Sequence, residues 1–144
     1  MAVRKEWKIN PIDLKKNVAV GVKLPFGGAG IFQLSYTTEE QAISNLKNLV
    51  LTRKGERPFQ PLFGTDVYSL LFEQIGGFIE DNLKASITED IGFWLPYILL
   101  SDVIVDAQPD SNRVNISLNF RVTESGANQT IIIYVDQQGG LTIA

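Results

Sequence analysis

Paired carboxylates are the acid–base chemistry left open to this sequence of 144 residues, because it contains no His and no Cys. Hydrolysis of a glycoside needs two carboxylates that face each other. The adjacent pairs Glu80–Asp81 and Glu89–Asp90 lie in a predicted helix, where neighbouring side chains point about 100° apart, so neither pair is suited to this task. Glu56 and Glu73 remain as lone candidates, and no spacing sets them opposite each other.

The absence of Cys and His excludes disulfides, zinc fingers, and nucleophiles or general bases of these two types. We therefore expect no catalytic residues, no metal site and no cofactor. A peptidoglycan-degrading, lysozyme-like glycosidase that uses Glu56 or Glu73 is kept as the alternative function.

Charge is divided unevenly along the chain. Up to Gln60, ten Lys and Arg stand against five Asp and Glu, whereas the remainder has three against eleven. The first part thus carries +5 and the second −8. This polarity either orients the subunit between two different neighbours or is neutralised within one fold.

Part of the basic excess lies in an N-terminal segment that also contains an aromatic residue. The candidate binding residues of this arm are Lys5, Trp7, Lys8, Lys15 and Lys16. Trp7 could stack on a nucleobase, but the net charge of −3 argues against nucleic acid. We expect the arm to dock on an acidic protein surface, and expect neither a nucleic-acid nor a membrane partner.

Length and composition indicate a globular chain with one main domain, since 44% of the residues are hydrophobic and 20% are charged. No apolar run approaches the roughly 20 residues of a membrane span. The first eight residues lack the apolar stretch of a signal peptide, so we expect synthesis in the cytosol.

The first half of the sequence predicts an irregular arm followed by helices. Residues 1–36 show no sustained period, although a short strand over 18–24 is possible. Thr38 with Gln41 forms a capping-box pattern for a helix over about 39–51 that ends before Gly55. Asp66 is a plausible N-cap of a short helix. A second long helix follows, with its apolar stripe at Ile79, Leu83, Ile87 and Ile91 and its end before Pro96.

The second half predicts strands, because the period changes to two. Residues 113–122 alternate apolar and polar side chains, and strand-like segments flank them at 98–107 and 130–135. Short turns make these three an antiparallel meander, to which residues 141–144 could add an edge strand. The predicted fold is α+β, with two or three helices packed on a small C-terminal sheet, an arm at 1–36 and a single domain at 37–144.

The predicted strand at 130–135 has apolar residues on both sides, in the run Ile131, Ile132, Ile133 and Tyr134. Such a strand is either an ordinary central strand or one that accepts a strand from another chain. Both interpretations remain open at the level of the sequence.

A specific combination of motifs lies in residues 46–73. It consists of Leu51, Thr52, Gly55, Glu56, Arg57, Pro61, Phe63, Gly64, Leu71, Phe72 and Glu73. In its order and spacing it resembles the signature of the GPW family of phage baseplate wedge proteins, which also occurs in type VI secretion and related contractile machines. The resemblance covers about residues 38–136. It departs from the family at Leu95, Pro96 and Tyr97, where members usually carry Glu-Pro-Arg.

The resemblance implies a structural, non-enzymatic virion protein of the tail baseplate that is assembled in the host cytoplasm. Family members look like a trimmed sheath subunit, bind other wedge proteins in a hetero-oligomeric assembly of multiple copies, and start polymerisation of the tail sheath protein by strand sharing. The residues that we expect to take part in strand sharing are Thr130, Ile131, Ile132, Ile133, Tyr134, Val135, Leu141 and Ile143.

The loop that carries the motif admits two roles. Gly55 would end the preceding helix, Glu56 and Arg57 would pair with neighbours or with a helix end, and Phe59 and Phe63 would anchor the loop to the core. The loop either determines the fold or contacts a wedge partner directly. The residues for such a contact are Gly55, Glu56, Arg57, Pro58 and Phe59.

Overall fold

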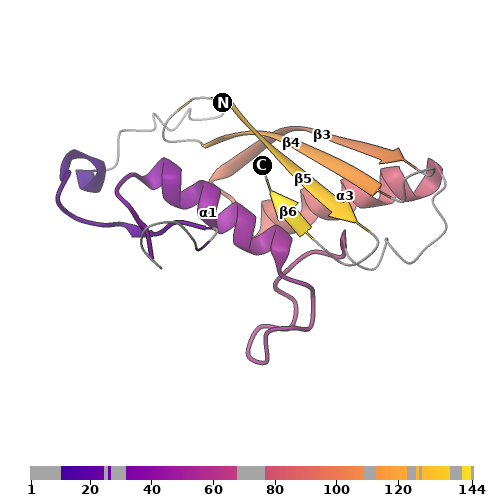
Figure 1. Ribbon diagram of the computed structural model, residues 1–144, viewed down its shortest axis with the longest axis horizontal. Helices are drawn as coiled ribbons and strands as arrows, with labels where there is room; N and C mark the ends of the chain where they lie inside the picture. The colour runs from indigo at the N-terminus through magenta and orange to yellow at the C-terminus, as the bar shows by residue number, and fades with distance from the viewer. Residues whose placement is uncertain are drawn as a thin grey trace, which may run out of the picture.

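Two helices lie against one face of a four-stranded antiparallel sheet (Figure 1). The computed structural model describes residues 11–24, 26, 32–67, 77–108, 113–122, 126, 128–136 and 141–143. The helices are α1 (Thr38–Leu51) and α3 (Gly77–Trp94), and the sheet order is β3 (Ile98–Gln108), β4 (Arg113–Val122), β5 (Asn128–Asp136) and β6 (Leu141–Ile143). The predicted α+β class and the meander with a short added edge strand are confirmed.

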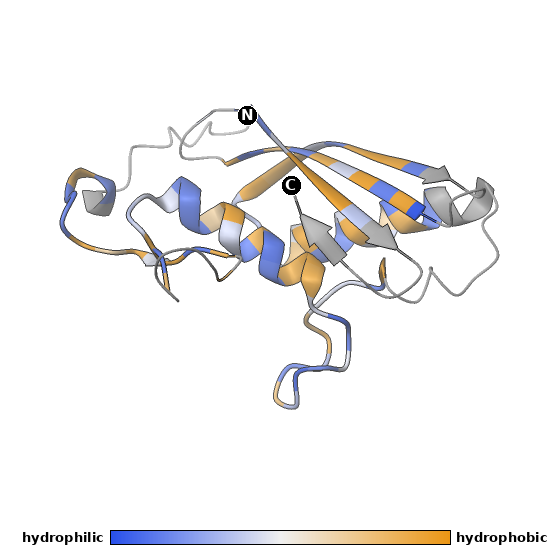
Figure 2. Cartoon of the chain, viewed as in Figure 1, coloured by the Kyte–Doolittle hydropathy of each residue, from blue (hydrophilic) through white to orange (hydrophobic). Residues whose placement is uncertain are grey.

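The core lies between the helices and the sheet. Ile116, Leu118 and Phe120 of β4 are buried, and they belong to one cluster with Leu49 of α1 and Ile87 of α3. The residues between them on β4 are more polar, which gives the banded strands of Figure 2. One face of the sheet thus excludes water, as the alternation of period two predicts.

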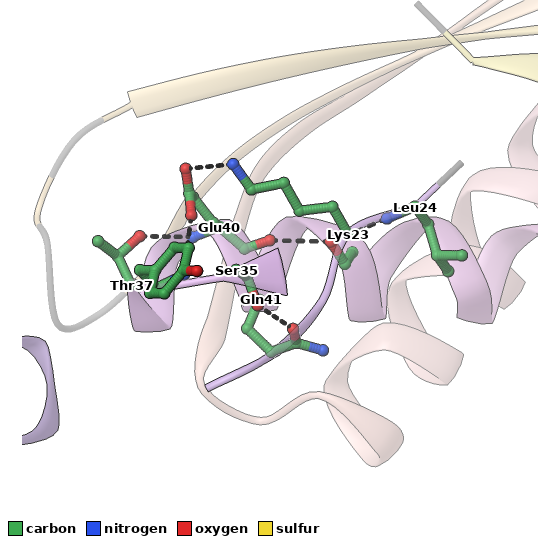
Figure 3. A network of polar contacts seen from close by, with 8 residues as sticks. Lys23, Leu24, Ser35, Thr37, Glu40 and Gln41 are labelled. Carbon is green, nitrogen blue, oxygen red and sulfur yellow. Dashed lines mark hydrogen bonds and ion pairs between the residues drawn. The ribbon is translucent and has the colours of Figure 1, made fainter. Parts of the chain in front are cut away.

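A hairpin of the N-terminal region packs on α1, and its first strand lies within residues 18–24, where the sequence allowed a short strand. After the short helix η1 (Pro11–Leu14), β1 (Gly21–Val22) pairs antiparallel with β2 (Leu34–Ser35). Lys23 Nζ lies 2.8 Å from Glu40 Oε1, and Ser35 Oγ donates to Gln41 Oε1 over 2.6 Å (Figure 3). Two short strands without an apolar alternation of their own are thus stabilised by polar contacts with a helix.

The N-cap of α1 is Thr37, one residue before the predicted cap. Its hydroxyl accepts from Glu40 N at 3.2 Å, and Glu40 Oε2 accepts from Tyr36 N at 3.1 Å. Thr38 has a different partner, because Asp13 Oδ1 accepts from its backbone N–H at 2.9 Å and from its hydroxyl at 2.5 Å. The long-range contact with Asp13 therefore decides which threonine caps the helix.

The ion pair between Lys23 and Glu40 predicts a small acid sensitivity. The hydrogen bond from Lys23 is the largest cause that lowers the pKa of Glu40 below its ordinary value of 4.5. A lowered pKa stabilises the fold above about pH 4.5, and this contribution is lost as the pH falls through the lowered pKa. Both side chains are more than a third exposed, so Glu40→Gln should cost less than about 1 kcal/mol at pH 7.

Urea unfolding of wild type and Glu40→Gln at pH 7 and pH 3 checks this expectation. The difference in the free energy of unfolding should be smaller at pH 3, because the contribution of Glu40 declines as the pH falls toward its lowered pKa. Lys23→Met is the matched variant, and should show the same dependence on pH. An equal difference at both pH values would contradict the assignment.

Candidate functional site

Two surfaces contain the predicted binding residues: the edge of the sheet at β5 and β6, and the loop after α1. On β5, Ile131 and Ile133 are buried in the core, Ile132 is half-buried, and Thr130 and Tyr134 are exposed. Thr130 Oγ1 donates to Asn119 Oδ1 at 2.7 Å on the face opposite the helices. The two-sided apolar run therefore has one covered side and one side that is partly open.

The strand β6 covers only one end of β5. Ile143 pairs with Ile133, Thr142 with Tyr134, and Leu141 with Val135. On its other side β5 pairs with β4 along its whole length, from Asn128 to Asp136. Within the described residues, no strand pairs with the outer side of residues 128–132. Among the described residues, this segment is therefore an open backbone edge of the sheet.

The opposite edge of the sheet has features that discourage strand addition. The register of β3 against β4 shifts between Leu100 and Asp102. Asp102 and Asp106 are exposed on this strand, and Asp102 Oδ1 accepts from Val103 N at 2.9 Å. Irregular register and charged side chains are common means by which edge strands avoid pairing. The two edges therefore differ in their readiness to bind a strand.

Backbone hydrogen bonds close the loop (residues 52–66) that follows α1. Gly55 N donates to Pro61 O at 2.7 Å, and Thr65 N donates to Thr52 O at 2.9 Å. The helix ends at Leu51, as predicted, but its C-cap is Thr52, so the role given to Gly55 in ending it is wrong. Gly55 has a φ of 93° and serves the turn within the loop instead.

Lys54 fastens the loop to α3. Its Nζ lies 3.0 Å from Asp66 Oδ2 and 2.9 Å from Asp90 Oδ1. Burial works to lower the pKa of Lys54, but the hydrogen bonds and charges of Asp90 and Asp66 outweigh it and raise the pKa above 10.5. Asp90 is only 8% exposed, so the predicted solvated face is wrong at this position. A lysine 36 residues away in the sequence decides this burial, and no helical spacing reveals it.

Three aromatic rings join the loop to the end of α3, and Arg57 joins it to α1. The Phe63 and Trp94 ring centroids are 5.2 Å apart, and those of Phe93 and Trp94 are 5.0 Å apart, both in edge-on geometry. The Arg57 guanidinium lies 3.9 Å from the Phe63 centroid and donates to Asn48 Oδ1 at 3.3 Å. Phe63 therefore anchors the loop, as predicted.

Phe59 does not anchor the loop to the core, contrary to prediction, because it is 99% exposed. Leu62 and Phe93 are also exposed and were not among the predicted binding residues. Phe93 lies two residues beyond Ile91 and therefore off the stripe of residues spaced four apart, which is the signal that could have identified it. Figure 1 shows the loop projecting from the end of α1, away from the sheet.

The remaining predicted residues are the candidate carboxylates Glu56 and Glu73 and the residues of the basic arm. Glu56 is exposed, and its Oε2 accepts from Arg53 N at 3.1 Å, so this carboxylate supports the loop backbone. Lys15 and Lys16 are exposed beside η1. Glu73, Lys5, Trp7, Lys8 and most of the predicted short helix after Asp66 lie outside the described residues.

Two other kinds of site are absent from the described residues. In the described part of the chain, no group of three Asp or Glu side chains is arranged to hold a metal ion. Neither described helix is long and apolar enough to cross a membrane.

The junction between α3 and β3 is held by apolar and aromatic contacts. Leu95 is 7% exposed and joins the core, whereas Pro96 is exposed. The hydroxyl of Tyr97 accepts from Asn45 Nδ2 of α1 at 2.9 Å. At the two positions where the resemblance led us to expect charged residues, Leu95 thus packs into the core and Tyr97 fastens the junction to α1.

Comparisons with known proteins agree with this architecture. The chain is 29% identical over 82 residues to the baseplate wedge protein gp25 of Enterobacteria phage T4, a match that covers 57% of this chain and 62% of the T4 protein. The chain thus matches about three fifths of the length of that relative.

Solved structures share the fold at lower identity. A tail lysozyme, so described, from Geobacter sulfurreducens has a TM-score of 0.61 at 21% identity, covering 68% of this chain and 89% of that one. A chain of the anti-feeding prophage baseplate has a TM-score of 0.59 at 24% identity, covering 69% and 79%. A chain of the type VI secretion baseplate complex has a TM-score of 0.55 at 14% identity, covering 65% and 88%.

The family assignment rests on a match that spans most of the predicted domain. The family model described as baseplate wedge protein gp25 matches residues 37–127, which include both described helices, the loop, β3 and β4. The predicted resemblance is confirmed, and the chain belongs to the gp25 family of baseplate wedge proteins.

Proposed function

We propose that this baseplate wedge protein initiates sheath assembly by accepting or exchanging a strand at the edge formed by β5 and β6. The observation that carries the proposal is the uneven covering of β5, whose residues 128–132 extend beyond the three-residue β6. A strand added there would gain backbone hydrogen bonds, while side chains such as Ile132 and Tyr134 would contribute contacts on the partly open face.

The opposite edge supports the choice of this one. A strand approaching β3 would meet a shifted register and the exposed carboxylates of Asp102 and Asp106. The partner that we propose is the tail sheath protein, in keeping with the family relationship. Docking to other wedge proteins is assigned to the loop, including Gly55 to Phe59, and to the basic arm with Lys15 and Lys16.

A proline scan over residues 129–132 tests strand sharing. In an antiparallel strand, successive N–H groups point alternately to the two sides, so two of the four positions donate toward β4 and two donate outward. Proline at the two positions whose N–H donates toward β4 should destabilise the fold. Proline at the other two should leave the thermal midpoint within a few degrees of wild type and abolish sheath on baseplates, as counted by electron microscopy.

Ile132→Thr is the control, because threonine is also β-branched and keeps the backbone N–H. It should form sheath. Removal of residues 137–144 should also prevent sheath formation while the protein remains soluble. Sheath of normal length on baseplates that carry a folded outward-position proline variant would overturn the proposal.

A further inference from the structure

Three large apolar side chains project from the loop and the end of α3. Phe59 is 99% exposed, Leu62 74% and Phe93 73%, and we call these three residues the aromatic knob. Single exposed apolar residues are ordinary, but several on one loop and on the helix end that it contacts indicate an interaction surface. Phe59 and Leu62 lie on the same loop, and the ring contacts of Phe93 with Trp94 and of Trp94 with Phe63 link the end of α3 to that loop.

The loop that carries the aromatic knob is held in one conformation. Gly55 and Pro61 are hydrogen-bonded across it, and Lys54 ties it to Asp66 and Asp90. Such preorganisation lowers the conformational entropy lost on binding. An exposed phenylalanine on a rigid support is suited to contribute strongly to an interface.

Arg57 adds a charge beside the aromatic knob. Its guanidinium rests on the Phe63 ring and donates to the neutral amide of Asn48. Among the described residues, Arg57 makes no ion pair with a carboxylate. A partner that places a carboxylate here would gain a charge-assisted hydrogen bond with a side chain that is already oriented.

We propose that the aromatic knob inserts into a concave apolar groove on another protein of the baseplate, with an Asp or Glu at the rim that pairs with Arg57. A convex apolar projection requires a concave apolar partner, and the charge of Arg57 selects an acidic rim. The inference rests on the proposed placement in a baseplate and names the chemistry of the docking partner.

Two hollows that the described residues form on a second copy of this chain fit this description poorly. The pocket of about 280 Å³ beside α1 is apolar, but no acidic residue is among its lining residues Val20, Thr38, Gln41, Ala42, Asn45, Tyr97 and Val122. A second hollow, of about 300 Å³ between α3 and β3, contains Asp102 but also Lys84, whose charge would repel Arg57. The groove is therefore assigned to a different protein.

Site-specific photocrosslinking tests the proposal in assembled particles. Benzoylphenylalanine is introduced at Phe59 in the full chain, contractile particles are purified and irradiated, and the crosslinked peptides are identified by mass spectrometry. We expect a different baseplate protein, crosslinked at a segment that combines apolar residues with Asp or Glu. Crosslinks only to the sheath, only to a second copy, or to no protein would overturn the proposal.

Surface variants give an independent measurement. The double variant Phe59→Ser, Leu62→Ser should keep the wild-type thermal midpoint and lower incorporation into particles about tenfold or more. Phe32→Ser is the matched control at a side chain 66% exposed in the hairpin, and should be incorporated normally. Arg57→Glu should also lose incorporation, and reversing the charge of the crosslinked carboxylate should restore it.

Different results contradict the proposed baseplate function and the proposed role of the aromatic knob. If wild-type protein is absent from the particles, the proposed baseplate function is wrong and this inference falls with it. If wild type is incorporated and the double variant is incorporated equally well, only the inference about the aromatic knob is wrong.

Discussion

Gly64→Ala is expected to lower the free energy of unfolding by about 3 kcal/mol or more. Gly64 has a φ of 125°, a conformation that residues with a side chain rarely adopt. A Cβ at this position would lie 2.4 Å from Thr52 O and 2.9 Å from Arg53 C, both backbone atoms that no rotamer change can move. The carbonyl of Thr52 also accepts from Thr65 N, so relief of the contact would open the end of the loop.

Gly55→Ala is the matched control for this substitution. Gly55 also has a positive φ, of 93°, but a Cβ there would meet nothing within 4 Å. It should therefore show the conformational strain alone, about 1–2 kcal/mol. Denaturant unfolding of both variants measures the difference, and equal destabilisation would show that the close approach of Gly64 to the backbone is unimportant.

Lys54→Met is expected to cost about 2–3 kcal/mol, because it leaves the buried carboxylate of Asp90 without its cation. Asp90 is 8% exposed, and its Oδ2 has no hydrogen-bond partner among the described residues, so Lys54 is the main compensation for its charge. The lysine side chain is 29% exposed, which holds the effect below that of a fully buried pair. Urea unfolding at pH 7 gives the measurement.

Two further variants separate the contributions of Asp66 and Asp90, the two carboxylates that contact Lys54. Asp66→Asn should cost less than Lys54→Met, because the Asp66 side chain is 47% exposed and is readily solvated. Lys54→Met together with Asp90→Leu should recover part of the lost stability, since no buried charge then remains. A double variant no more stable than Lys54→Met would contradict the role given to Asp90.

The raised pKa of Lys54 determines how its contribution to the free energy of unfolding changes with pH. The contribution of Lys54 is fully present below its ordinary pKa of 10.5 and is lost as the pH rises through the raised value. The difference between wild type and Lys54→Met should therefore be constant across neutral pH and shrink only in strong alkali.

The regular elements were predictable because their signals are local. Leu83, Ile87 and Ile91 recur at helical spacing and are buried, and the alternation in residues 113–122 matches a strand with one buried face. The loop motif was also visible in the sequence, since the order of its residues alone led to the family that the comparison later confirmed.

The cap of α1 and the attachment of the loop to α3 depended on contacts between distant residues. Thr37 caps α1 because Asp13 binds Thr38, and Asp90 is buried because Lys54 reaches it from the loop. Neither partner lies within a helical turn of the residue that it affects, so no periodicity could reveal it.

By itself the sequence determined the fold class, the family and the absence of Cys and His chemistry, because composition, short periods and an ordered motif are properties of neighbouring residues. Only the tertiary structure decided that Phe63 anchors the loop while Phe59 projects from it, and that β6 leaves part of β5 uncovered. These outcomes depend on which distant groups fill the space beside each residue, and local spacing does not determine that.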